Sequence, residues 1–197
     1  MLIIHDMSEM LAELEKIETD RLRFRRITRL DVEIAFEILS HPEVTRYWSS
    51  PPMIAMSEAE AFVDRKLASY EKGGSFQLGV EIKENGELIG ACSFFNHHAT
   101  CKRAEIGYVF ARKHWGKGYA TEAVIGLIET CFGPLGLNRL EADIDPRNEP
   151  SAKLLRRLGF KEEGFLRQRW IVSGEISDAA FYGLLMRDWE ECRRLHE

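Results

Sequence analysis

The sequence predicts a single α/β domain, in which a mixed, mostly antiparallel sheet of six to seven strands carries helices on both faces. Segments with alternating apolar residues are interleaved with segments of helical periodicity, in the order β-α-α-β-β-β-α-β-α-β-β. One predicted strand is apolar on nearly every residue, as a strand covered on both faces is. At 197 residues, of which 45% are apolar, the chain can bury one sizeable core.

The first half of the chain begins with residues 1–18, which we expect to form a helical N-terminal extension to a domain of residues 19–197. A strand over residues 21–27 and a helix over 28–40 follow. A second helix over 57–72 is expected to start with a capping box formed by Ser57 and Glu60. In the intervening loop, Tyr47 and Trp48 are interpreted as lids on the core; the alternative is a wall of the substrate site.

The middle of the chain predicts a hairpin that pairs residues 76–83 with 88–95 around a tight Asn85-Gly86 turn, in which both residues have positive φ. The nearly continuous apolar strand spans 101–112. A helix over 118–132 ends at Gly133-Pro134. A strand over 138–145 comes next, followed by a helix that starts at Asn148 and is closed by Gly159. Two strands around a Ser173-Gly174 turn and a short helix from Trp189 complete the chain.

Composition excludes several classes of function. The net charge of −5 argues against a nucleic-acid or anionic-membrane surface. The four cysteines are scattered, which is typical of the reduced thiols of a cytoplasmic protein, and no export signal or membrane-spanning run of about 18 apolar residues is expected. His97 and His98 have no carboxylate at ligand spacing, so we expect no metal site and interpret them as a solvated hairpin end; the alternative is that they line the acceptor cleft.

A glycine turn, Gly116-Lys117-Gly118, lies where a strand ends and a long helix begins. Its spacing fits neither the dinucleotide fingerprint nor the phosphate-binding P-loop. The free N–H groups of a helix N-terminus can still bind an anion, with Lys117 and Arg112 adding charge. The alternative is a plain turn in which glycine serves only the φ angles.

A second helix start follows at Asn148 and Ser151, directly after a strand. Taken singly, Asn148 is an N-cap, Pro150 suits the first turn, and Ser151 is a first-turn residue.

Together, "AEIGYVF", "GKGYATEA" and "NEPSAKLLRRLGF" resemble the GNAT superfamily of acyl-CoA-dependent N-acetyltransferases over about residues 19–189. With "ETDRLRFR" added, the chain is most similar to the Rim-type branch, which acetylates N-terminal amines of ribosomal proteins. The resemblance implies the GNAT acyltransferase fold and acetyl-CoA as cosubstrate, without a metal. It implies a primary amine as acceptor, and it leaves a homodimer open.

The resemblance also implies the site residues that bind acetyl-CoA. Main-chain groups near Val109, Phe110 and Ala111 would bind the pantetheine arm. Asn148 would line that arm or a water, and Ser151 would face the departing sulfur. The main-chain N–H groups expected to hold the pyrophosphate are those of Gly116, Lys117, Gly118, Tyr119, Ala120 and Thr121. Trp115 stands where the family signature has glutamine or arginine.

The expected general base is Glu105, because burial among apolar neighbours would make its carboxylate a stronger base. The alternative is a buried glutamate satisfied by arginine or backbone donors. Ser151 is expected to donate a hydrogen bond to the departing thiolate. Some Rim-type enzymes carry a carboxylate near the position of Trp170, so Glu105, Glu175 or a water chain remains as the base.

We therefore expect an N-acetyltransferase that acts on a protein N-terminal amine, for example of a ribosomal protein. The first alternative is an enzyme that acetylates a small amine such as a polyamine, an amino sugar or an antibiotic. The second is a non-catalytic acyl-CoA-binding domain.

Overall fold

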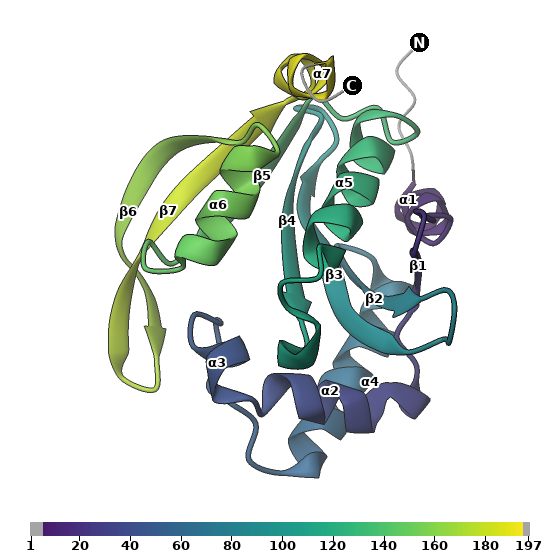
Figure 1. Ribbon diagram of the computed structural model, residues 1–197, viewed down its shortest axis with the longest axis vertical. Helices are drawn as coiled ribbons and strands as arrows, with labels where there is room; N and C mark the ends of the chain where they lie inside the picture. Colours follow the sequence, from purple (N-terminus) through teal and green to yellow (C-terminus); the bar gives the residue numbers. More distant parts are fainter. Residues whose placement is uncertain (1–5, 195–197) are drawn as a thin grey trace.

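The computed structural model describes residues 6–194 and forms one seven-stranded sheet with helices on both faces (Figure 1), which confirms the predicted fold class. The strand order is β1-β2-β3-β4-β5-β7-β6, and all neighbours are antiparallel except the parallel pair β4 and β5. The strands are β1 Leu22–Arg26, β2 Ser75–Ile82, β3 Leu88–His98, β4 Arg103–Phe110, β5 Arg139–Ile144, β6 Lys161–Val172 and β7 Glu175–Leu185.

The helices bury the two faces of the sheet separately. The larger core lies between the sheet and α1, α5 and α6, whereas two smaller apolar clusters lie between the other face and α2 and α4. The helices are α1 Met7–Leu14, α2 Val32–Leu39, α3 Pro42–Thr45, α4 Met56–Lys72, α5 Tyr119–Phe132, α6 Glu149–Arg157 and α7 Met186–Arg194. The apolar side chains of α1 are part of the larger core, so this segment is packed onto the sheet domain.

Two local predictions about capping and turns were wrong. The N-terminus of α4 is capped by Glu58, not by Ser57 and Glu60, since its carboxylate accepts from the N–H groups of Ile54 at 2.6 Å and Ala55 at 3.1 Å. In the β2–β3 turn only Gly86 has a positive φ, because the loop is closed as a longer turn by the Gly86 N–H donating to Ile82 C=O. The Ser173-Gly174 turn is confirmed, with both φ angles positive.

Helix α3 was not predicted, and α7 begins three residues before the expected Trp189. Pro42 occupies the first turn of α3, where a missing N–H costs nothing. His41 caps this helix by accepting from the Glu43 N–H at 3.2 Å.

The centre of the sheet contains a fork. Strands β4 and β5 pair only through Arg103–Glu105 with Arg139–Glu141, and they separate beyond these three residue pairs. The joint is held by the buried carboxylate of Glu141, which accepts from Arg103 Nη1 and from Arg139 Nε, both at 2.7 Å. Beyond these three residue pairs, the main-chain N–H and C=O groups on the facing edges of β4 and β5 do not hydrogen-bond across to the neighbouring strand.

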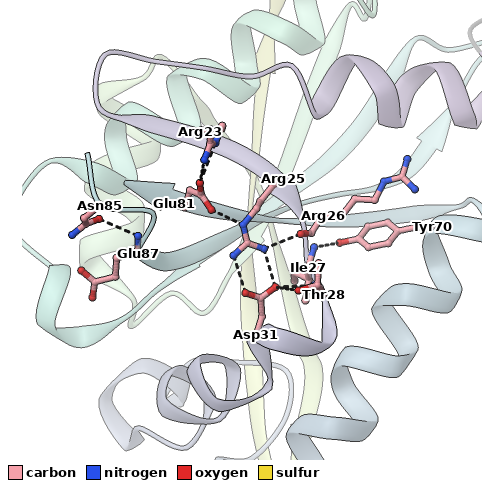
Figure 2. Close-up of polar contacts among 10 residues, drawn as sticks. All are labelled: Arg23, Arg25, Arg26, Ile27, Thr28, Asp31, Tyr70, Glu81, Asn85 and Glu87. Atoms are coloured by element: carbon pink, nitrogen blue, oxygen red, sulfur yellow. Dashed lines mark hydrogen bonds and ion pairs between the residues drawn. The ribbon is translucent and has the colours of Figure 1, made fainter. Parts of the chain in front are cut away.

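At the edge of the sheet, a charged network ties β1 and β2 to the start of α2 (Figure 2). Arg25 lies between two carboxylates: its Nε donates to Glu81 at 2.5 Å, and Nη1 and Nη2 both donate to Asp31 at 2.8 Å. Arg23 Nε also donates to Glu81, at 3.0 Å. Asp31 in turn accepts from the Thr28 N–H at 2.7 Å, which fixes the chain before α2.

Replacing Glu81 with glutamine should lower the free energy of unfolding by about 1–3 kcal/mol at pH 7. Burial alone would raise the pKa of Glu81, but hydrogen bonds from Arg23 and Arg25 outweigh burial and lower it. The stabilisation is therefore complete above the unfolded carboxyl value of about 4.3 and is lost as pH falls through the lower folded value. Urea unfolding at pH 7 and pH 3.5 measures the difference, which should shrink at the lower pH.

Glu60→Gln, on the exposed side of α4, is the matched control and should change little at either pH. An equal loss for Glu81→Gln at both pH values would contradict the assignment to ionisation.

Candidate active site

A cleft of about 800 Å³ opens at the fork. Glu105 and Tyr108 line it from β4, and Asn148 and Ser151 line it from the start of α6. Because side chains alternate along a strand, Glu105 and Tyr108 lie on opposite faces of the sheet. The cleft therefore passes through the sheet and brings together candidates from both faces. Further walls come from residues 45–52 before α4, from α4 and β2, and from parts of the β6–β7 hairpin between residues 169 and 177.

Glu105 is half-buried, not buried as its apolar neighbours suggested. Its Oε1 accepts from Asn96 Nδ2 at 2.9 Å, and no arginine or lysine of residues 6–194 forms an ion pair with it. The alternative of a buried glutamate satisfied by arginine or backbone donors is also wrong, because the donor is the side-chain amide of Asn96. The reason is the fork, which leaves this side of β4 open from Glu105 onward.

Glu175 and Trp170, the other residues weighed for the base, also line the cleft. The carboxylate of Glu175 accepts from Arg147 Nη1 at 2.8 Å, and Arg147 donates through Nη2 to Asp145 at 2.6 Å. Asp143 forms an ion pair with Arg169, in which Oδ2 and Nε are 3.7 Å apart. Among the carboxylates that the structure describes around the cleft, Glu105 alone has no cation within ion-pair distance.

The start of α6 has the capping geometry expected from its sequence. Asn148 is the N-cap, its Oδ1 accepting from the Ser151 N–H at 3.3 Å, and Pro150 lies in the first turn. Ser151 lines the cleft beside Tyr108, whose side chain is its polar neighbour there.

Tyr108 is a further polar residue of the cleft. Its hydroxyl lies 3.5 Å from the main-chain oxygen of Ser151, and burial raises the pKa of Tyr108 to about 12. At neutral pH it therefore keeps its proton and can act as a hydrogen-bond donor. Strand alternation could have indicated this position, because it places Tyr108 on the face that α6 covers.

The glycine turn has the geometry of an anion site. Gly116 and Gly118 have φ of +75° and +81°, which glycine adopts without a Cβ penalty. The N–H groups of residues 116–121 donate to no acceptor in the described part of the chain, and a Cβ on Gly116 would meet only open space. Lys117 at its mouth has no ion pair within residues 6–194. Arg112, expected to add charge there, instead donates to Glu43 at 3.0 Å.

Arg21, just before β1, contacts this turn and holds it in position. Its Nη1 donates to the Lys117 carbonyl at 3.1 Å, and its guanidinium carbon lies 4.5 Å from the centre of the Tyr119 ring. Glu122, in the first turns of α5, holds Arg21 by accepting from Nε at 2.6 Å and from the N–H at 2.8 Å. The position of the turn therefore depends on a residue almost a hundred positions earlier. Sequence reasoning missed Arg21, since no local pattern shows this contact.

Trp115 closes the end of β4, where the family signature has another residue. Its Nε1 donates to Phe110 C=O at 2.8 Å, while the Ala111 N–H donates to Ile89 C=O at 2.9 Å on the β3 side. Since main-chain groups alternate in direction along a strand, Tyr108 and Phe110 present theirs to the fork, and Val109 and Ala111 present theirs to β3. Of the three residues expected beside the pantetheine arm, Phe110 has the suitable orientation.

The two adjacent histidines lie at the solvated end of β3. His98 Nδ1 accepts from the Cys101 N–H at 3.1 Å, and burial lowers the pKa of His97. Within residues 6–194, no group of three or more histidine, cysteine or acidic residues is arranged to hold a metal ion. The same residues include no helix that is long and apolar enough to cross a bilayer.

Comparisons with known proteins agree with this geometry. The acetyltransferase (GNAT) domain family matches residues 21–161. An uncharacterised N-acetyltransferase, p20 of Bacillus licheniformis, is 38% identical over 89% of this chain and 99% of its own. The [ribosomal protein uS5]-alanine N-acetyltransferase of Escherichia coli is 25% identical over 88% of this chain and 92% of its own. A spermidine N-acetyltransferase from Vibrio cholerae, solved with CoA and spermine, superimposes with a TM-score of 0.75 at 21% identity, covering 87% of this chain and 99% of its own.

Proposed function

The chain belongs to the GNAT family of acetyltransferases, and from this premise we propose that it transfers an acetyl group from acetyl-CoA to the N-terminal amine of a protein. Family membership makes it an acyltransferase. The observation that carries the proposal is the fork between β4 and β5, which brings Glu105 from one face and Ser151 from the other into a single cleft. A base and a hydrogen-bond donor then flank the place where acyl transfer would occur.

The residues present fit acetyl-CoA, which supplies an activated acetyl thioester when bound. The free N–H groups of residues 116–121 lie at the N-terminus of a 14-residue helix, where the helix dipole favours the charge of a pyrophosphate. The main-chain groups of Tyr108 and the N–H of Phe110 face the fork and suit the amides of a pantetheine arm, while the Phe110 carbonyl accepts from Trp115. Asn148 keeps its Nδ2 for the same ligand, because its Oδ1 caps α6.

The chemistry asks for a neutral amine and a stabilised leaving thiolate. A protein α-amine titrates near 7.7–8.0, so at neutral pH a carboxylate or a carboxylate-bound water is a sufficient base. Glu105 acts as the base, since the charge of Glu175 is neutralised by its ion pair with Arg147. On the other side of the cleft, the Ser151 hydroxyl donates a hydrogen bond to the departing sulfur, and Tyr108 is a second donor beside it.

A protein N-terminus is supported as acceptor by the relative that acetylates ribosomal protein uS5. A small amine is the second candidate, because a cleft of about 800 Å³ also falls within the range of small-molecule sites. The fold neighbour crystallised with spermine is of that class.

Release of free CoA thiol tests the proposal. The protein is incubated with acetyl-CoA and a panel of peptides with free N-termini, amino sugars and polyamines. Release with a peptide above the water rate supports N-terminal acetylation, and mass spectrometry locates the acetyl group. Release only with a small amine would favour the second candidate. Binding of CoA without release for any amine would leave a non-catalytic domain.

Ser151→Ala should lower kcat by about tenfold to a hundredfold, with the KM for acetyl-CoA little changed, because the lost hydrogen bond forms mainly to the departing sulfur. Steady-state kinetics with a saturating acceptor measure both constants. Ser177→Ala removes another serine hydroxyl from the lining of the cleft and serves as the control. Equal activity of Ser151→Ala and the unmodified protein would remove Ser151 from the mechanism.

A further inference from the structure

We infer that the acceptor amine carries a carboxylate or other anionic group, which binds a basic pocket at the β2 end of the cleft. For the proposed function, this describes a protein N-terminus with an acidic residue at its second or third position. The inference rests on the proposed function, and it adds a requirement that neither the fold nor the relatives impose.

The floor of this pocket is a cross-strand row on the sheet face that α4 covers. Gln77, Ser93 and Gly107 are direct partners on β2, β3 and β4, and all three line the cleft. Glycine at the end of the row leaves room above it, since a Cβ added to Gly107 would come no closer than 3.7 Å to any neighbouring atom. The row thus presents one amide and one hydroxyl to the cleft.

Gln77 is the residue of this row that indicates a ligand site. The residue is only 4% exposed and its side-chain amide makes no hydrogen bond to any residue of the described chain, but the amide atoms are not enclosed, so they reach the cleft that Gln77 lines. An amide in this position is therefore placed to donate to a ligand in the cleft.

The roof of the pocket is basic. The Tyr70 hydroxyl donates to the Gln77 main-chain oxygen, which fixes α4 over β2. Lys66 lies one turn earlier on the same side of α4, its ammonium 4.9 Å from the centre of the Phe62 ring, and it lines the cleft together with Arg65. Burial, and then the charge of Arg65, lower the pKa of Lys66. An anion between Lys66 and Gln77 would relieve both effects.

No carboxylate already fills this role. Arg65 and Lys66 form no ion pair within residues 6–194, whereas the acidic residues Asp143, Asp145 and Glu175 lie on the opposite wall and face Arg147 and Arg169. The unpaired charges at the β2 end are therefore positive, which disfavours a polyamine there.

The distance between the basic pocket and Glu105 sets the length of the acceptor. Gln77 is two strands and two residues away from Glu105, or roughly 12 Å for a strand spacing of about 4.8 Å and a rise of about 3.4 Å per residue. Three residues of extended chain span about 10 Å. With the α-amine at Glu105, an acidic side chain at the second or third residue reaches Lys66.

Three peptides of equal length test the inference, starting Ser-Glu-Glu, Ser-Gln-Gln and Ser-Lys-Lys, with spermidine as a fourth acceptor. We expect kcat/KM to be at least about tenfold higher for the acidic peptide, mostly through KM. Lys66→Glu should remove this preference and improve the basic peptide, and Gln77→Leu should raise KM for the acidic peptide alone. Lys72→Glu makes the same charge change on α4 outside the cleft and should leave the preference unchanged.

Equal or higher kcat/KM for the neutral peptide, the basic peptide or spermidine would overturn the inference while leaving acetyl transfer intact. So would a loss with Lys66→Glu that is equal for all acceptors, since that is a structural effect. If no amine is acetylated, the proposed function fails. Calorimetric binding of the acidic peptide then decides the inference separately, and no tighter binding than for the neutral peptide would overturn it.

Discussion

Glu105→Gln should lower kcat by about a hundredfold or more, which is the typical contribution of a general base. The amide keeps the shape of the side chain and a hydrogen bond to Asn96, but it cannot accept a proton from the amine. The variant then depends on acceptor that is already neutral, a fraction that falls about tenfold per pH unit below the amine value of about 7.7. The loss should therefore grow as pH falls from 8 to 6, measured as kcat against pH with a peptide acceptor.

The matched control is Glu175→Gln, which removes a carboxylate from the same cleft that is already neutralised by Arg147. Its kcat should change only a few-fold, with no change in the shape of the pH profile. If Glu105→Gln kept the pH profile of the unmodified protein, the base would be another group or water alone.

Gly90→Ala should lower the free energy of unfolding by about 2–3 kcal/mol, as overpacking of a tight interior does. Gly90 pairs with Phe110, and a Cβ there would lie 2.4 Å from the Val109 oxygen and 2.5 Å from Phe110 Cδ1. One of these atoms is main chain, so the strands themselves must move apart. Urea unfolding measures the loss of stability. The KM for acetyl-CoA should also rise, because the main chain of Phe110 faces the fork and would shift with the strand.

Gly107→Ala provides the comparison in unfolding experiments, since a Cβ there meets its nearest atoms at 3.7 and 3.8 Å, which is ordinary contact. It should change the free energy of unfolding by well under 1 kcal/mol. Comparable losses for the two variants would show that the cost comes from β-strand glycine in general and not from the contact with Phe110.

Most of the fold could be predicted from residue patterns because periodicity reports burial directly. The alternating residues of β1 and β5 and the apolar stripe of α5 are local patterns in the sequence. The structure has two strands and a helix at these positions, as predicted. The errors came from choices between equivalent local signals. Ser57 and Glu58 both suit the start of α4, and Pro42 suits either a helix end or a helix start; tertiary packing decides between them.

The candidate site was predictable where it depends on helix starts and not where it depends on the sheet. Asn148 as N-cap, and the free N–H groups after Gly116, follow from the chain itself. The exposure of Glu105 and the direction of the Phe110 main chain follow from where β5 leaves β4, which no single segment encodes. The unpaired amide of Gln77 is likewise visible only when three strands and α4 are placed together.

The fork also bears on whether its open strand edges can pair with another chain. An unpaired strand edge is a template for pairing with another chain, and proteins usually protect such edges with charges, bulges or a covering element. Here β4 beyond Glu105 and β5 beyond Glu141 leave two such edges, but they face each other across a cleft in the middle of the sheet. A strand from a second molecule would have to enter between the loop of residues 45–52 and the β6–β7 hairpin. The opening that admits a ligand is thereby shielded from aggregation by its own position in the fold.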